Sequence, residues 1–210
     1  MGSCLDAFLK RTKKNNRKAG LVLLVLLLLG TGACKFPGSA PKAPAKPAPE
    51  LKQETVQAEK LADPKDTSKP HDYSILIKKG EFTLYLLDNG KPVAYWGVAL
   101  GKHPGQKEKS GDMKTPTGTF KVDEIDDAST WTHDFGDGKG VIAHAYGPWF
   151  ISLDTSDLSK GEWDGIGIHG THDPASIGTR ASEGCIRLNN KDLETLKPYV
   201  KVGTKVVIEE

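Results

Sequence analysis

The sequence contains very little cysteine. Among its 210 residues there are three, Cys4, Cys34 and Cys185, and the first two lie near the N-terminus. The remainder of the chain holds a single thiol, so an internal disulfide framework is excluded. A lone cysteine is often a small, inert core residue. The Ser-Glu-Gly sequence before Cys185 and the arginine two positions after it favour a functional thiol instead.

Long apolar runs, phosphate-binding loops, repeats and a charge excess are also missing. Residues 21–29 form an unbroken apolar run of nine, well short of the ~20 that comfortably span a bilayer. No glycine-rich phosphate loop and no internal repeat occurs. The net charge is +2, but residues 1–33 hold six of the 29 Lys and Arg and one of the 27 Asp and Glu. The rest is slightly acidic, and nothing in the charge indicates a nucleic-acid partner.

The N-terminal 34 residues have the order of an export signal. A basic segment at residues 10–18 precedes the apolar run, and Gly30-Thr31-Gly32-Ala33 and Cys34 follow it. The pattern resembles a bacterial lipoprotein signal in which Cys34 becomes the acylated first residue, although Thr31 stands where leucine is usual. Two other interpretations of the segment remain open, an ordinary signal-peptidase site and an uncleaved membrane anchor. All three readings predict export to the periplasm or cell envelope, and an acylated Cys34 or an uncleaved anchor would make the membrane a partner.

Residues 35–71 are rich in proline, alanine and lysine. Seven of the 13 prolines lie between Lys35 and Pro70. Such a segment cannot bury enough apolar surface to fold and tends to extend as polyproline II. At ~3.1 Å per residue it reaches at most on the order of 110 Å. We interpret it as a disordered linker that tethers a domain to a membrane, and a spacer without a length requirement remains open.

The sequence pattern of residues 72–210 predicts one mostly β domain, either a sandwich or a barrel. Alternating or apolar segments indicate short strands, and the Asp88-Asn89-Gly90-Lys91 sequence indicates a hairpin because Asn-Gly accepts positive φ. Residues 123–140 are acidic and glycine-rich and predict a long loop that could act as a lid. Asn189 and Asp192 have the spacing of a helix start, and Pro198 predicts its end. The strands are expected at 73–77, 81–86, 93–100, 141–144, 149–153 and 205–208, and residues 116–120 lead into another strand.

One histidine and one cysteine mark the candidate site. His169 follows an apolar, glycine-spaced run, and Cys185 lies sixteen positions later between Gly184 and an isoleucine. A thiol is a useful nucleophile only as thiolate, and its ordinary pKa near ~8.5 must be lowered by a nearby base or cation. His169 can supply that base if the fold brings the two together. Gly184 permits a turn that leaves backbone N–H groups facing an oxyanion.

Four motifs occur in order along the domain: KTPTGTF at 114–120, YGPWF at 146–150, GIHGT at 167–171 and SEGCIRL at 182–188. Together they resemble the bacterial L,D-transpeptidase (YkuD-domain) family over about residues 72–210. The resemblance implies a β-rich catalytic domain, without a cofactor, that acts on peptidoglycan stem peptides. A cysteine would attack the carbonyl before a terminal D-alanine, and D-alanine would leave. An amine from another stem peptide or from a wall-anchored protein would resolve the thioester.

The resemblance also implies roles for individual residues. Cys185 is the nucleophile and His169 the base, with the backbone carbonyl of Gly170 orienting the imidazole. The N–H groups around Gly184 and Cys185 would form the oxyanion hole. Ser182 would brace the loop through a local hydrogen bond.

Substrate contacts are expected from three further side chains. Arg187 has the planar fork that suits a carboxylate, although a salt bridge to Glu183 or Asp192 is an equal alternative. Tyr146 and Trp149 are expected to line the cleft, with a core position open for Trp149. Glu183 departs from the family pattern, in which many members carry histidine before the Gly-Cys pair, and this leaves His169 as the necessary base.

Three alternatives stay open. His169, His172, Cys185 and His144 are zinc-ligand types, but no carboxylate lies at metalloprotease spacing, so we predict no metal. Water in place of an amine would make the domain an L,D-carboxypeptidase or amidase. A catalytically silent wall-binding module is the third possibility, and the intact His169–Cys185 pair argues against it. His133 is interpreted as a surface or loop histidine.

Overall fold

The computed structural model describes residues 61–64, 66, 68–136 and 138–210. The predicted export segment with Cys34, and most of the predicted linker, lie outside these residues. Within the described part, no helix is both long enough and apolar enough to cross a bilayer.

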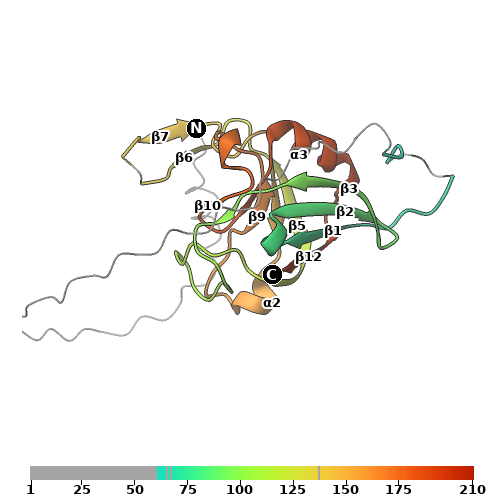
Figure 1. Ribbon diagram of the computed structural model, residues 1–210, viewed down its shortest axis with the longest axis horizontal. Coiled ribbons are helices and arrows are strands. Elements are labelled where there is room, and N and C mark those ends of the chain that lie inside the picture. Colours follow the sequence, from blue (N-terminus) through green and yellow to red (C-terminus); the bar gives the residue numbers. More distant parts are fainter. Residues whose placement is uncertain (1–60, 65, 67, 137) are drawn as a thin grey trace, which may run out of the picture.

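One eight-stranded sheet forms the body of the domain, in the order β11-β9-β8-β5-β12-β1-β2-β3 (Figure 1). Two small two-stranded sheets flank it, β4 (Leu100–Gly101) with β10 (Arg180–Ser182) and β6 (Thr132–Asp134) with β7 (Val141–Ala143). The strands of the main sheet are β1 (Tyr73–Lys78), β2 (Thr83–Asp88), β3 (Lys91–Gly97), β5 (Gly118–Asp127), β8 (Trp149–Leu153), β9 (Gly167–His169), β11 (Ile186–Arg187) and β12 (Lys205–Glu209).

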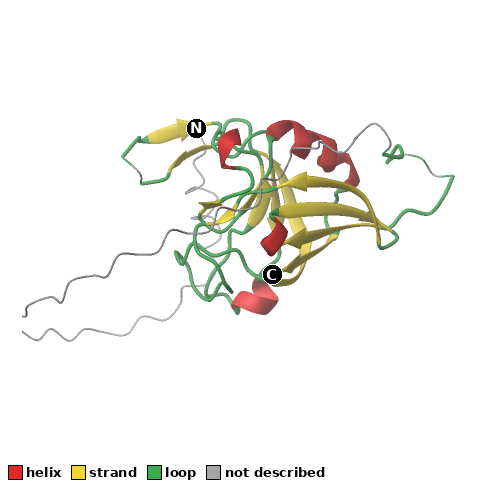
Figure 2. Ribbon diagram, viewed as in Figure 1, coloured by secondary structure: helices red, strands yellow, loops and turns green. Residues whose placement is uncertain are grey.

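Helices are few and short in the described residues (Figure 2). The longest, α3 (Asn190–Leu196), begins directly after the predicted cap Asn189 and continues into the 3-10 turn η4 (Lys197–Tyr199). The others are α2 (Ser156–Ser159) and the 3-10 turns η2 (Lys79–Glu81) and η3 (Pro174–Ser176). A mostly β domain with a short helix after Cys185 is thus confirmed.

The main sheet curls so that its two edges are linked. Its edge strands are β11 and β3. Ala99, two residues beyond β3, exchanges two backbone hydrogen bonds with Arg187 of β11, each 2.9 Å long. This bridge draws the edges together into a half-barrel and shields the backbone of β11, which would otherwise be an open edge.

Local sequence explains the β2–β3 hairpin. Asn89 and Gly90 both have positive φ, 49° and 75°, and Asp88 pairs with Lys91 across the turn. Asparagine and glycine accept this conformation at little cost, so the predicted turn forms where expected. Pro92 then lies on an edge strand, where its missing N–H removes no interior ladder bond.

The core lies between the sheet and α3. Ile75, Ile77 and Leu84 from the sheet, and Leu193 and Leu196 from α3, are all fully buried in one apolar cluster. Burial of each such side chain stabilises the fold by roughly 1.5–3 kcal/mol. Because α3 starts five residues after Cys185, its packing holds the end of the cysteine segment against the sheet.

The described end of the predicted linker touches the domain. Leu61 packs against the core, and the Ala62 carbonyl accepts a hydrogen bond of 3.0 Å from the Tyr199 hydroxyl. The imidazole of His71 lies 2.6 Å from the carboxylate of Asp88. Chain segments before Asp72 therefore contact the surface on which β1, β2 and η4 meet.

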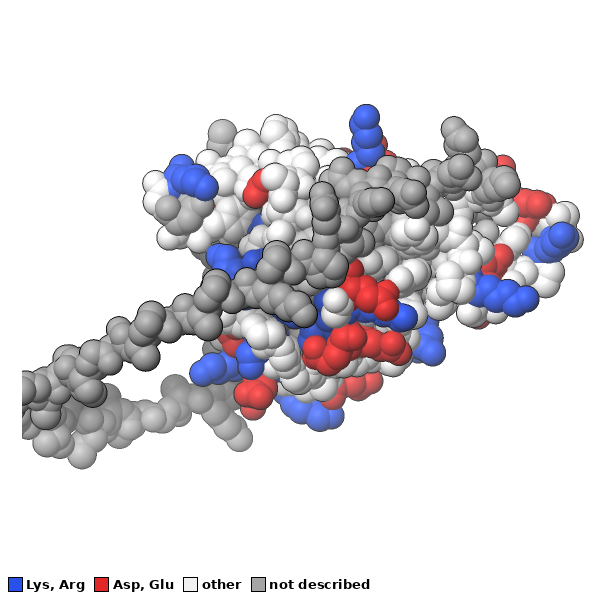
Figure 3. All heavy atoms as spheres, viewed as in Figure 1, with Lys and Arg blue, Asp and Glu red and all other residues white. Residues whose placement is uncertain are grey.

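The expectation of one long loop at residues 123–140 is wrong. Strand β5 continues to Asp127, and a hairpin of β6 and β7 follows. The charged residues of β5 hid the strand, because Glu124 and Asp126 face an aqueous cavity and thus break the apolar pattern on which strand prediction depends. On the uncovered part of the face shown in Figure 3, acidic and basic side chains lie beside one another.

Replacement of Leu193 by alanine should destabilise the domain. Leu193→Ala leaves a cavity beneath α3, and we expect a loss of about 2–5 kcal/mol in the free energy of unfolding, measured by urea denaturation. Leu158→Ala, the same change in a helix but at a side chain 42% exposed, should stay within about 0.5 kcal/mol of wild type. Equal effects of the two variants would contradict this account of the core.

Candidate active site

A cavity of about 450 Å³ opens on one face of the curled sheet. Cys185 and His169 both line it, together with the predicted residues Tyr146, Ser182 and Arg187. Its volume is in the range of small-molecule and peptide side-chain sites. The two residues that the sequence separates by sixteen positions thus share one solvent-connected space.

Sheet pairing brings His169 and Cys185 together. Strands β9 and β11 are parallel neighbours, and Arg187 is in register with His169. Cys185 directly precedes β11, so it emerges from the sheet beside the strand that carries His169. Adjacent strands lie about 4.8 Å apart, and both side chains line the same cavity.

His169 is buried and held as a neutral base. Its exposed fraction is 2%, and its Nδ1 donates a 2.6 Å hydrogen bond to the Gly170 carbonyl, the partner that the resemblance implies. Burial, followed by the positive charge of Arg187, lowers the pKa of His169 from its ordinary 6.5 to about 3, against the opposing effect of the Gly170 bond. Since Nδ1 carries the proton, Nε2 remains the atom that can accept one.

Two aromatic rings pack against the imidazole of His169. Phe150 stacks on His169 with ring centroids 5.4 Å apart and an interplanar angle of 14°, and the Tyr146 ring lies 4.9 Å away. Asn190, at the start of α3, accepts a 2.9 Å hydrogen bond from the Thr171 N–H. A Cβ on Gly170 would collide with this Asn190 amide oxygen, so glycine is required beside the histidine.

The cysteine loop is braced internally by Ser182. The Ser182 hydroxyl donates a 2.6 Å bond to the Cys185 carbonyl and accepts one of 3.1 Å from the Gly184 N–H. Gly184 has φ of +138°, and a Cβ there would lie 2.9 Å from the Lys114 carbonyl oxygen. The glycine is therefore needed for both conformation and space. Because its N–H is directed to Ser182 in this structure, it is not the simple oxyanion donor that was expected.

The thiol of Cys185 is half-buried at the cavity wall. Its Sγ donates a hydrogen bond of 3.3 Å to the Gly165 carbonyl. Gly165 belongs to the segment that leads into β9, so the same strand positions the thiol contact and His169.

Arg187 is a buried cation. Only 5% of it is exposed, and its Nε has no hydrogen-bond partner among the described residues. Burial lowers the pKa of the guanidinium, and the charges of Cys185 and Glu183 oppose that shift. The guanidinium lies 4.9 Å from the centre of the Phe135 ring. Within the described part of the chain, no salt bridge joins it to Glu183 or Asp192.

His133 belongs to the site, and its interpretation as a surface or loop histidine is wrong. Its Nε2 lies 3.1 Å from a Glu183 carboxylate oxygen, and its Nδ1 lies 3.1 Å from the Tyr146 hydroxyl. The imidazole thus bridges the residue before Gly-Cys to the tyrosine that contacts His169. Glu183, which replaces the histidine of many family members, meets an imidazole from β6 instead.

The β6–β7 hairpin supplies an aromatic wall. Trp131 and Phe135 line the cavity, and Phe135 contacts both His133, at 4.4 Å between ring centroids, and His172, at 5.1 Å. The sequence did carry a signal, because Trp131, His133 and Phe135 alternate with polar residues as in a strand with one buried face. The acidic, glycine-rich surroundings obscured it.

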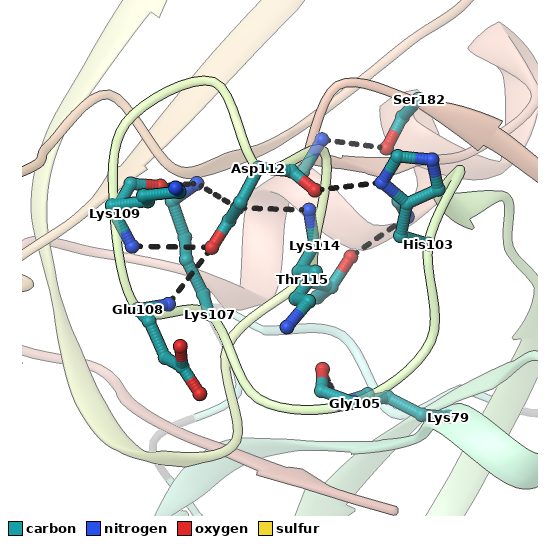
Figure 4. A network of polar contacts seen from close by, with 12 residues as sticks. Lys79, His103, Gly105, Lys107, Glu108, Lys109, Asp112, Lys114, Thr115 and Ser182 are labelled. Atoms are coloured by element: carbon teal, nitrogen blue, oxygen red, sulfur yellow. Dashed lines mark hydrogen bonds and ion pairs between the residues drawn. The ribbon is translucent and has the colours of Figure 1, made fainter. Parts of the chain in front are cut away.

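Asp112 organises the loop on another side of the cavity. Figure 4 shows its carboxylate at the centre of the turn, and it accepts 2.8 Å bonds from the Lys107 Nζ and the Glu108 N–H and 3.1 Å bonds from the N–H groups of Lys109 and Lys114. Burial alone would raise the pKa of Asp112, but these donors hold it well below its ordinary value. The charged carboxylate therefore fixes the shape of a cavity wall.

Trp149 does not line the cavity, so that expectation is wrong. Its ring packs against the main core, with the Lys197 Nζ 4.6 Å from the ring centre. The neighbouring Phe150 faces the cavity, because successive residues of a strand point to opposite faces of the sheet.

The structure offers no support for the zinc alternative. Among the residues it describes, no three His, Cys, Asp or Glu side chains lie close enough to hold a metal ion. His144 donates from Nδ1 to the Ser129 carbonyl, and the His172 ring packs on Phe135.

The fold and the site define a β-rich catalytic domain with a histidine and a cysteine in one cavity. Residues 72–208 match the family model of the L,D-transpeptidase catalytic domain, YkuD. The chain belongs to this L,D-transpeptidase family.

Named relatives agree with this assignment. The putative L,D-transpeptidase YkuD of Bacillus licheniformis is 52% identical over 136 residues, and that of Bacillus subtilis is 34% identical over 136 residues. Each alignment covers 65% of this chain and 65% of the relative, so the chain spans about two thirds of their length.

Solved structures show the same fold. An L,D-transpeptidase from Mycobacterium smegmatis superposes with a TM-score of 0.51 at 16% identity, over 67% of this chain and 59% of that chain. L,D-transpeptidase 3 from Mycobacterium tuberculosis, in complex with a faropenem-derived adduct, gives 0.50 at 15% identity, over 67% of this chain and 61% of that chain.

Stability should depend on pH through His169. The unfolded chain binds a proton at this histidine below about pH 6.5, whereas the folded chain does so only near pH 3, so the free energy of unfolding should fall as pH drops through this interval. His169→Gln should flatten the dependence of the free energy of unfolding on pH. The measurement is urea denaturation between pH 4 and pH 8 in unit steps, which is roughly the range in which an ordinary histidine titrates. An unchanged slope in the variant would contradict a buried neutral imidazole.

Loss of His133 should slow the reaction of Cys185 with iodoacetamide. His133→Ala removes the imidazole beside the Glu183 carboxylate, whose charge then disfavours a nearby thiolate. We expect about a threefold slower reaction, the size of effect that a partly exposed charge interaction supports. Peptide mass spectrometry separates Cys185 from Cys4 and Cys34. The double variant His133→Ala, Glu183→Gln should recover the rate. No recovery would show that His133 acts only by packing.

Proposed function

We propose that this protein is a cysteine-dependent L,D-transpeptidase acting on peptidoglycan stem peptides. The observation that carries the proposal is the shared cavity of Cys185 and a neutral His169 whose Nδ1 is held by the Gly170 carbonyl. A proton-accepting Nε2 beside a thiol is the arrangement that activates a cysteine nucleophile. The family membership supplies the reaction class.

In the first half-reaction the Cys185 sulfur attacks the carbonyl carbon before the terminal D-alanine. The thiol proton passes to the Nε2 of His169, and the sulfur–carbon bond forms. The oxyanion would be stabilised by the Cys185 N–H, with the Arg187 charge nearby favouring the thiolate and the anion. The carbon–nitrogen bond then breaks, His169 returns its proton to the leaving amine, and D-alanine departs.

In the second half-reaction an amine attacks the thioester. The amine loses a proton to the Nε2 of His169, a new amide bond forms, and the sulfur leaves and recovers the proton. The acceptor is a second stem peptide or a wall-anchored protein. Tyr146, Trp131 and Phe135 line the cavity, and their apolar rings would limit the access of water, which would otherwise hydrolyse the intermediate.

The setting proposed for this reaction is the cell envelope. The basic and apolar segments before Cys34 are typical of an exported protein, and acylation at Cys34 would hold it at a membrane. The proline-rich residues after Cys34 would then let the domain reach the wall.

Replacement of Cys185 tests the chemistry. Cys185→Ala should abolish both D-alanine release and crosslink formation while circular dichroism and the unfolding midpoint stay as in wild type. Cys34→Ala, which removes a different thiol, should retain both activities on soluble muropeptides. Turnover by the Cys185→Ala protein would eliminate the proposed nucleophile.

A carbapenem should acylate Cys185. We expect the intact mass of the protein to rise by one equivalent of the β-lactam, with the modification mapped to the peptide that contains Cys185 and absent from Cys185→Ala. No mass gain in the wild-type protein would contradict an activated, accessible thiol. Digestion of muropeptides with product identification then separates crosslinking from trimming, because water as acceptor yields a tripeptide stem without a crosslink.

A further inference from the structure

Cavity-facing residues form a row across four strands of the sheet. Asp126 of β5 pairs with Phe150 of β8, Phe150 pairs with His169 of β9, and His169 pairs with Arg187 of β11. All four side chains line the cavity. Neighbouring strands are about 4.8 Å apart, so the three steps from Asp126 to Arg187 amount to about 14 Å along the curled sheet. The row therefore runs from a carboxylate at one end to a guanidinium at the other.

The acidic end of this row contains more than one carboxylate. Glu124, two positions before Asp126, pairs with Ser152 of β8, and both Glu124 and Ser152 line the cavity. Asp164 also lines it, and the next residue, Gly165, accepts the hydrogen bond from the Cys185 thiol. Three carboxylates thus extend from the far wall of the cavity to the edge of the nucleophile.

Two other charged side chains of the cavity are bound to charged or polar side chains, and a third, Arg187, is not fully satisfied. Lys107 is bound to Asp112 at 2.8 Å, and Glu183 is bound to His133 at 3.1 Å. Arg187 differs, because its Nε is buried and without a hydrogen-bond partner among the described residues. Such a group loses stabilisation unless a bound anion satisfies it. The cavity therefore holds a buried cation, Arg187, two residues from Cys185, and an acidic wall that runs from β5 to Asp164.

We propose that Glu124, Asp126 and Asp164 form a capture site for the ammonium group of the acyl acceptor, while Arg187 binds a carboxylate of the acyl donor. The proposal rests on the proposed transpeptidase function and names the substrate charge that each end of its cavity selects.

The positions of the two ends fit the order of the reaction. The D-alanine carboxylate lies one residue beyond the carbonyl that Cys185 attacks, so a cation next to Cys185 and in register with His169 is well placed for it. An acceptor amine is positively charged in water, and a cleft lined with negative charge raises the local concentration of such a group. Asp164 brings the acidic wall up to the thioester, where neutral His169 can take the proton that the attacking amine must lose.

The experiment separates the two half-reactions. The donor is a stem tetrapeptide ending in D-alanine, and the acceptor is a stem tripeptide whose third residue has a free side-chain amine. The rate of acylation is measured from D-alanine release or from carbapenem adduct formation. Acceptor use is measured as the KM of the tripeptide. The variants are Glu124→Gln, Asp126→Asn and Asp164→Asn, singly and together. The control is Asp123→Asn, which removes one exposed carboxylate from the same strand outside the cavity.

We expect the triple variant to raise the acceptor KM about tenfold, the lower range for electrostatic focusing in a cleft. The rate of acylation should be unchanged or higher, because the donor is anionic and three repelling charges are gone. Added salt should raise the acceptor KM of wild type and have little effect on the variant. Asp123→Asn should behave as wild type. The single variants, each with a smaller rise, provide the test if the triple variant does not fold.

Two results would overturn the capture site. One is an unchanged acceptor KM in all variants with normal acylation. The other is an equal loss of acylation and acceptor use, which would indicate a structural role for the carboxylates. Failure of the proposed function is distinguishable, because wild type itself would then release no D-alanine and form no carbapenem adduct.

Discussion

The pairing of β9 with β11 is the contact on which the site depends. It places Arg187 beside His169 and leaves Cys185 at the end of the neighbouring strand. The bridge from Ala99 to Arg187 secures β11 from its other side, so a strand of only two residues is held by backbone bonds on both edges. A short strand fixed in this way can carry a nucleophile at a defined position, because its backbone has no freedom to shift register.

Burial determines the electrostatics of the cavity. His169 is buried at the cavity wall next to the cation Arg187, so its imidazole is neutral, and the Gly170 carbonyl selects which nitrogen carries its proton. Burial of Arg187 with an unsatisfied Nε has a cost, and a substrate carboxylate would offset it. The acidic residues of β5 balance the cavity from the opposite wall. Charge separation across the sheet, rather than net charge, is thus the property that distinguishes possible ligands.

Much of the framework could be predicted from local sequence. The Asn89-Gly90 turn, the start of α3 after Asn189 and most of the strands depend on interactions within a few residues, which the sequence shows directly. The second half of β5 was missed because Glu124 and Asp126 face a cavity, and apolar alternation is informative only where one face of a strand is buried. Strand β6 was missed because the sequence around it is acidic and rich in glycine. The same cause hid His133, whose neighbours in sequence are polar but whose neighbours in space are Tyr146 and Glu183.

The sequence by itself determined the candidate pair His169 and Cys185, the glycines beside it and the mostly β class, because residue chemistry and backbone freedom are local properties. Only the tertiary structure decided that Trp149 belongs to the core, that Ser182 engages the Gly184 N–H, and that Glu124, Asp126 and Arg187 share a cavity. These facts depend on which strands are neighbours and in what register. Pairing between strands far apart in the chain is set by the packing of the whole sheet and is not encoded in any one segment.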